Sequence, residues 1–165
     1  MAPQILIIAC GNTLRSDDGI AWCAAEALEG KFPAEQVKIL RVHQLAPELA
    51  EPISQSRRVI FLDAATTDQG KPGEIRVQHA RRNTASPSSG FCHAFSASNA
   101  LALAEQLYGA TPDAYFVSMI GDNFSHGESL SESVAFSMPQ FVARVERLIQ
   151  DCLHQESRVV NHEGH

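Results

Sequence analysis

Residues 5–19 read ILIIACGNTLRSDDG, and this stretch decides the fold. Residues 5–10 form a continuous aliphatic run that stops at Gly11, which is typical of a parallel strand buried on both faces. A short polar loop follows, and the apolar residues beyond it recur at helical spacing until Gly30. The stretch therefore predicts a strand, a loop and a helix, which is the opening unit of an α/β domain.

The rest of the chain repeats this alternation. Continuous or alternating apolar runs predict strands at residues 37–42, 59–62, 74–78 and 114–120. Helical spacing predicts helices at residues 47–53, between Ser96 and Gly109, and at residues 134–152. Pro139 is expected to break the last of these into two pieces. The order of elements predicts a three-layer α/β fold, in which a twisted, mostly parallel sheet carries helices on both faces.

The length of 165 residues predicts a single domain, which we place at residues 1–154. Residues 155–165 are polar and histidine-rich, so we expect them to form a disordered tail. The four cysteines are dispersed without a CxxC pair, and the apolar run at the N-terminus is too short for a signal peptide or a membrane span. These features predict a cytoplasmic protein with reduced thiols.

The charge pattern narrows the choice of partners. The formal net charge is −6, and acidic and basic residues are scattered along the chain. Nucleic acids and anionic membranes attract clustered Lys and Arg, so we expect neither as a partner. One small domain without an obvious sticky patch predicts a monomer.

Asp17 and Asp18 stand at the start of the first predicted helix. A glycine-containing loop between a strand and a helix suggests a nucleotide site, but the GxGxxG pattern is absent. Two carboxylates at the positive end of the helix would also repel a phosphate. We expect one acid to cap the helix, which leaves the other for a functional site.

Asp63 is predicted to end the third strand, and His93 to lie on the loop before the helix that begins after Ser96. Loops that follow parallel strands gather at the carboxyl edge of the sheet. Asp18, Asp63 and His93 are therefore expected to converge there. Two carboxylates and an imidazole suit a borderline divalent ion such as nickel or zinc.

Other catalytic patterns are weaker. The nucleophile elbow GxSxG is absent, and residues 162–165 (HEGH) lack the spacing of HExxH. We interpret Asp122 and His126 as ordinary loop polarity, and Cys92, which precedes His93, as a loop thiol.

Several segments together resemble the hydrogenase maturation proteases. The matching segments are IACGNTLRSDDG at 8–19, HQLAPEL at 43–49, LDAA at 62–65 with PG at 72–73, His93 before a helix, and LSESV at 130–134 with Pro139 beyond. Members of this family are endopeptidases that clip the C-terminal extension from the large subunit of nickel–iron hydrogenases. The resemblance extends from about residue 4 to residue 152, and one departure is Ala21, where the family usually has glycine.

The resemblance implies roles for three residues. Asp18, Asp63 and His93 would contact metal at the catalytic site, and the metal would be the nickel that the precursor already carries. The enzyme would then cleave only a metal-loaded precursor. From their place in the first loop, Asn12 and Arg15 are candidate donors to the substrate backbone or to a developing oxyanion.

Two other functions stay open at this point. The first is a non-catalytic nickel-binding or precursor-binding chaperone, because the sequence displays no nucleophile. The second is a nucleotide- or flavin-binding domain of similar topology, which the paired acids after the first strand disfavour.

Overall fold

The computed structural model describes residues 3–80 and 95–163 of the chain. Within these residues a five-stranded sheet has the order β2-β1-β3-β5-β4. The strands are β1 (Ile5–Cys10), β2 (Val37–Val42), β3 (Arg58–Ala65), β4 (Ile75–Ala80) and β5 (Asp113–Ile120). Strand β4 runs antiparallel to β5 at one edge, and the other neighbouring strands run parallel. The predicted mostly parallel sheet is confirmed.

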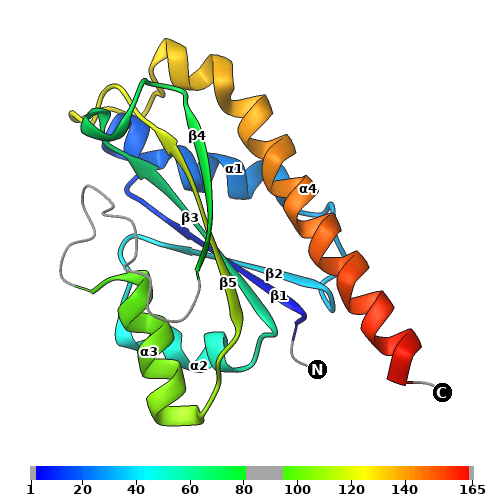
Figure 1. Cartoon of the computed structure of the whole chain (residues 1–165). Coiled ribbons are helices and arrows are strands. Elements are labelled where there is room, and N and C mark those ends of the chain that lie inside the picture. The colour runs from blue at the N-terminus through cyan, green and yellow to red at the C-terminus, as the bar shows by residue number, and fades with distance from the viewer. Residues whose placement is uncertain (1–2, 81–94, 164–165) are drawn as a thin grey trace.

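Helices cover both faces of this sheet. They are α1 (Ile20–Leu28), α2 (Ala50–Ser54), α3 (Ala97–Tyr108) and α4 (Glu132–Glu163), with 3₁₀ turns η1 (Ser16–Gly19), η2 (Pro47–Leu49) and η3 (Thr67–Gln69). Figure 1 shows α1 and α4 on one side of the sheet and α2 and α3 on the other. The three-layer α/β architecture predicted from the sequence is therefore confirmed.

Strand β1 lies at the centre of the core because both of its faces are covered. Ile5, Ile7 and Ala9 pack in the cluster formed with α1 and α4. Leu6 and Ile8 pack in the cluster formed with α2 and α3. Alternate residues of a strand point to opposite faces, so an aliphatic run without alternation fills both layers.

Local signals define α3 at both ends. The hydroxyl of Ser96 accepts a hydrogen bond from the backbone N–H of Asn99 at 3.1 Å, which caps the first turn. Gly109 ends the helix in a left-handed conformation, with φ of 68°, that favours glycine. The predicted boundaries of this helix are confirmed.

Helix α4 corrects the prediction that Pro139 breaks the last helix. The helix is continuous from Glu132 to Glu163 with Pro139 inside it. A proline inside a helix costs about 3 kcal/mol, whereas each fully buried aliphatic or aromatic side chain contributes about 1.5–3 kcal/mol. Phe141, Val145 and Ile149 of α4 are fully buried, so packing outweighs the local cost.

The prediction of a disordered tail at 155–165 is corrected for residues 155–163, because α4 continues to Glu163, and residues 164–165 fall outside the described residues. Glu156 is 9% exposed and accepts hydrogen bonds from Arg57 at 2.5 Å and from Arg58 at 2.7 Å. Arg58 also donates to the carbonyl of Cys152 at 3.0 Å. These contacts fasten the C-terminal part of α4 to the start of β3, so this part of the helix belongs to the domain.

Within the described residues, no helix combines the length and the apolar composition that a bilayer span requires.

Candidate functional site

The first loop brings Asp18 back against the end of β1. The backbone N–H of Asn12 donates to Oδ2 of Asp18 at 2.9 Å. A Cβ atom on Gly11 would lie only 2.0 Å from the carbonyl oxygen of Asp18, so only glycine permits this close approach. Asp18 is 7% exposed. Its burial raises the pKa of its carboxyl, while the Asn12 N–H and the charge of Arg15 act in the opposite direction.

The structure corrects the expectation that one acid of the Asp17–Asp18 pair caps α1. The N-cap residue of α1 is Gly19, and no side chain caps that end of the helix. Each carboxylate instead accepts backbone N–H groups from elsewhere, Asp18 from Asn12 and Asp17 from the loop after β5. Asp18 therefore binds within its own loop, whereas Asp17 binds residues more than 100 positions away in the sequence.

Asp17 is fully buried and joins three segments of the chain. Its Oδ2 accepts hydrogen bonds from the backbone N–H groups of Asp122 and Asn123, both at 2.8 Å. The backbone N–H and the hydroxyl of Ser131 donate to Oδ1 and Oδ2, both at 2.7 Å. Hydrogen bonds to a charged acceptor are stronger than those between neutral groups. Asp17 thus anchors the turn that carries Asp18, a role that local sequence rules did not reveal.

Backbone contacts reinforce this anchor. The N–H of Ser16 donates to Gly127 at 2.8 Å, and the N–H of Asp17 donates to Asn123 at 2.9 Å. Ser16 has a positive φ of 51°, which costs a non-glycine residue roughly 1–2 kcal/mol. Its hydroxyl donates to the carbonyl of Ser125 at 2.9 Å. The surrounding loops therefore hold a strained backbone immediately before the two acids.

Asp63 lies inside β3, and the prediction that it ends the third strand is wrong by two residues, since β3 continues to Ala65. Asp63 pairs with Ser118 of β5, whereas the pairing of β3 with β1 ends one residue earlier, at Leu62. Asp63 is half-buried, and its Oδ1 accepts a hydrogen bond from the backbone N–H of Ala64 at 2.8 Å. By this register it lies level with Cys10, the last residue of β1, at the carboxyl edge of the sheet.

Asp18 and Asp63 both lie at this edge. Asp18 is bonded to Asn12, two residues beyond β1, and Asp63 follows the last β3 residue that pairs with β1. His93, the third expected member of the site, falls outside the described residues. Across residues 3–80 and 95–163, no three His, Cys, Asp or Glu side chains gather closely enough to hold a metal ion.

Asn12 and Arg15 have structural contacts in the first loop. The side-chain oxygen of Asn12 accepts a hydrogen bond from the N–H of Leu14 at 3.0 Å, which stabilises the turn. Nε of Arg15 donates to the carbonyl of Phe124 at 3.3 Å. Their role toward a substrate stays a prediction.

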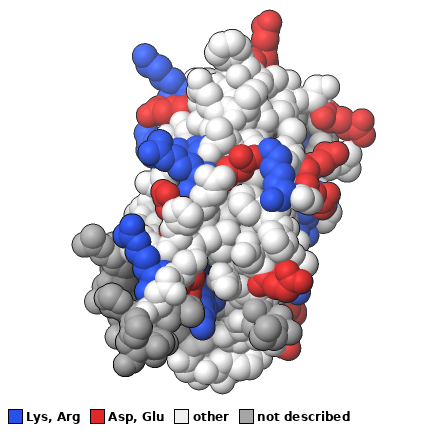
Figure 2. Space-filling view, turned by 90° about the vertical axis from the view of Figure 1, so that its right-hand side faces the viewer, with Lys and Arg blue, Asp and Glu red and all other residues white. Residues whose placement is uncertain are grey.

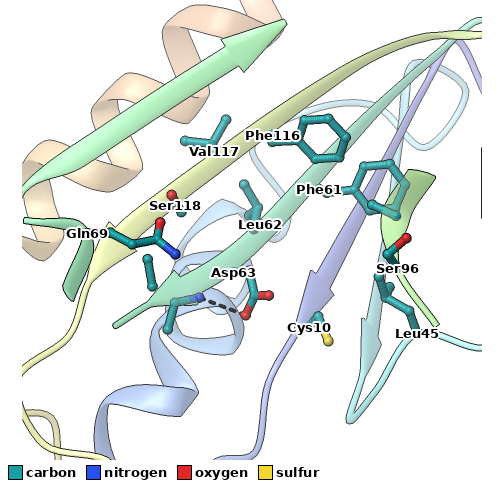
Figure 3. Close-up of a pocket in the computed structure, with 13 residues that line it drawn as sticks. Cys10, Leu45, Phe61, Leu62, Asp63, Gln69, Ser96, Phe116, Val117 and Ser118 are labelled. Carbon is teal, nitrogen blue, oxygen red and sulfur yellow. Dashed lines mark hydrogen bonds between the residues drawn. The ribbon is translucent and has the colours of Figure 1, made fainter. Parts of the chain in front are cut away.

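A small pocket opens beside Asp63 (Figure 3). Cys10, Asp63 and Ser118 come from the adjacent strands β1, β3 and β5 and line its inner surface. Ile8, Phe61 and Phe116 precede them by two residues on the same strands, and these three residues belong to the core on the α2 and α3 side of the sheet. Side chains two apart on a strand share a face, so the three point to the same side of the sheet. Our sequence analysis missed Ser118, because a serine inside an apolar strand carries no functional pattern.

The competing features stay peripheral. Asp122 and His126 are exposed on the loop after β5, in agreement with their interpretation as loop polarity. Basic and acidic side chains are interspersed on the face of the molecule shown in Figure 2. In the first loop, the backbone N–H of Asn12 donates to the Asp18 carboxylate. A phosphate-binding loop uses such N–H groups to bind the ligand, so this contact disfavours a nucleotide site.

No family model and no curated protein sequence match the chain. Its structure is similar to the [NiFe] hydrogenase maturation protease HybD from Thermococcus kodakarensis, with a TM-score of 0.74 and 24% identity over 88% of this chain and 99% of that one. It is also similar to the hydrogenase maturating endopeptidase HybD from E. coli, with a TM-score of 0.69 and 21% identity over 90% and 93% of the two chains. A third similar structure is the maturation protease HycI from Thermococcus kodakarensis KOD1, with a TM-score of 0.67 and 18% identity over 89% and 92%. The chain therefore has the fold of the hydrogenase maturation proteases.

Proposed function

We propose that this protein is an endopeptidase that removes the C-terminal extension of a nickel–iron hydrogenase large-subunit precursor after nickel insertion. One observation carries the proposal: solved proteins named as hydrogenase maturation proteases share the fold over 88–90% of this chain. The sequence segments that resemble the family supply independent support, and two of them contain Asp18 and Asp63.

Asp18, Asp63 and His93 recognise the nickel ion, which arrives as part of the substrate. Burial raises the pKa of the Asp18 carboxyl, so its charged form lacks part of the solvation that water would give it. A divalent cation at this carboxylate would compensate for that loss and displace any bound proton. Carboxylate oxygens and an imidazole nitrogen are suitable donors for nickel.

This arrangement explains how the enzyme distinguishes loaded from unloaded precursor. A partly completed ligand set binds an ion held by the substrate more strongly than it binds the same polypeptide without the ion. Specificity then equals the difference between the two binding free energies. The protease acts as a monomer in the cytoplasm, and the free thiols of Cys23 and Cys152 are typical of a reducing compartment.

The decisive experiment is incubation of the pure protein with nickel-loaded and nickel-free precursor, followed by intact-mass measurement. We expect loss of a C-terminal peptide from the loaded precursor alone. Asp18→Asn, Asp63→Asn and His93→Ala should abolish the loss. Asp122→Asn and His126→Ala are matched controls, because both residues are exposed on a neighbouring loop, and these variants should retain activity.

Calorimetric titration with the loaded precursor separates the alternative functions. Binding without any change in mass would indicate the non-catalytic chaperone. Neither binding nor cleavage would refute the proposal, as would cleavage that the three site substitutions leave unchanged.

A further inference from the structure

We propose that the pocket beside Asp63 is a specificity subsite that accepts one small aliphatic side chain of the precursor, close to the cleaved bond. This inference rests on the proposed endopeptidase function, because the pocket adjoins a residue assigned to nickel recognition. It adds a chemical requirement on the substrate that the metal alone does not impose.

The walls of the pocket are mainly apolar. Phe61 and Phe116 stack with ring centroids 5.5 Å apart, and both are less than one-tenth exposed. Leu45 and Cys10 also line this apolar part. Figure 3 shows Leu45 on the same side as the two phenylalanine rings, and Cys10 between Leu45 and Asp63. Transfer of a hydrocarbon side chain from water to these walls would be favourable, because few polar groups would lose their hydrogen bonds to water.

Some polar residues of the pocket lie near Asp63, whereas Ser96 lies beside Phe61 and Leu45. Gln69 and Ser118 lie toward the Asp63 side in Figure 3, away from the phenylalanine rings. Asp63 disfavours an anionic side chain through like-charge repulsion. The apolar walls disfavour a long cationic side chain, because its charge would lose solvation.

The size of the pocket sets an upper limit on its occupant. Its volume is about 50 Å³, roughly one third of the ~150 Å³ of a cavity that holds benzene. Two or three carbon atoms therefore fit, whereas a phenyl ring does not. The pocket is this small because two phenylalanines border it, and it is open at all because Cys10, Ala97 and Ser118 are short. An alanine or valine side chain is small enough for this volume and apolar enough for these walls.

The test uses nickel-loaded precursors that carry Gly, Ala, Val or Phe at each of the three residues on either side of the cut. At one of these positions, kcat/KM should rise about tenfold or more from Gly to Val and fall again for Phe. Ser118→Leu, which fills the pocket, should lower kcat/KM for the Val precursor about tenfold more than for the Gly precursor. Gln78→Val is the matched control: it places an extra aliphatic side chain on exposed strand β4, outside the pocket, and should leave the profile unchanged.

The same side-chain series, made as peptides spanning the cut and titrated by calorimetry, separates the two proposals. Cleavage with a flat side-chain profile at all six positions, or a profile that Ser118→Leu leaves intact, overturns the subsite and preserves the protease. Binding that depends on the side chain, without cleavage of any precursor, overturns the protease and preserves the pocket as a binding site. If there is neither cleavage nor binding that depends on the side chain, both the protease and the subsite proposals are refuted. The wild-type series alone decides the matter if Ser118→Leu does not fold.

Discussion

The Asp17 carboxylate accepts hydrogen bonds from both the backbone N–H and the hydroxyl of Ser131, each at 2.7 Å, across 114 residues of sequence. Ser131 directly precedes α4, and Asp17 lies in η1, so this contact connects the first loop of the domain to its last helix. Because Asp18 is the next residue, the position of the proposed site depends on Asp17, which is fully buried.

Asp17→Asn should therefore destabilise the whole domain. The amide would present N–H donors to backbone N–H groups that need an acceptor, and hydrogen bonds to a charged group contribute about 1.5–3 kcal/mol each. We expect the free energy of unfolding, measured with urea, to fall by about 3 kcal/mol or more. Asp122→Asn, at an exposed position, should change it by only about 0.5 kcal/mol. Similar losses in both variants would contradict the anchoring role.

Asp18→Asn should have the opposite effect on stability near neutral pH. Burial raises the folded-state pKa of Asp18 above its ordinary value of 3.8. Its contribution to stability is therefore fully present below pH 3.8 and is lost as the pH rises through the higher folded-state pKa. The Asn variant lacks this loss and can still accept the hydrogen bond from Asn12.

The stability of Asp18→Asn relative to the wild type should thus increase between acidic and neutral pH. Urea unfolding at a series of pH values checks this, and a relative stability that stays constant or falls would contradict it. Combined with the loss of processing proposed above, a more stable but inactive variant would identify a carboxylate retained for function.

Gly11→Ala should disturb Asp18 without touching its side chain. The new Cβ would lie 2.0 Å from the carbonyl oxygen of Asp18, so the loop must move. Gly30→Ala is the control, because Gly30 has a φ of +77° but a Cβ added there would meet nothing within 4 Å. The control should lose about 1–2 kcal/mol from backbone strain alone, and it should keep any processing activity. Equal losses of stability and activity in the two variants would refute the close-approach argument.

Glu156→Gln tests whether the end of α4 belongs to the domain. The side chains of Arg58 and Glu156 are only 13% and 11% exposed. Removing the Glu156 charge leaves Arg58 with one more distant carboxylate, that of Asp113 at 3.8 Å. We expect the free energy of unfolding to fall by about 2 kcal/mol. Glu146→Gln breaks an ion pair with Lys31 that is far more exposed, and it should cost about 0–1 kcal/mol. A protein truncated after residue 154 with unchanged stability would show that the tail interpretation was right.

The sequence by itself determined the elements of this fold and most of their limits. The aliphatic run of β1, the Ser96 cap and Gly109 all act through neighbouring residues. The strand and the ends of the helix can therefore be predicted without knowledge of tertiary contacts. The placement of Asp18 and Asp63 at one edge of the sheet also followed, since parallel strands put their carboxyl ends together.

Tertiary structure decided the rest, for reasons of distance and packing. Pro139 remains inside α4 because the buried face of the helix outweighs a local penalty, and residues beyond 154 stay helical because Arg57 and Arg58 bind Glu156. Local rules treated Asp17 and Asp18 as interchangeable candidates for a cap. Only the fold brings Asp122, Asn123 and Ser131 around Asp17, and these long-range partners make Asp17 a buried anchor, whereas Asp18 binds the loop at the carboxyl edge of the sheet.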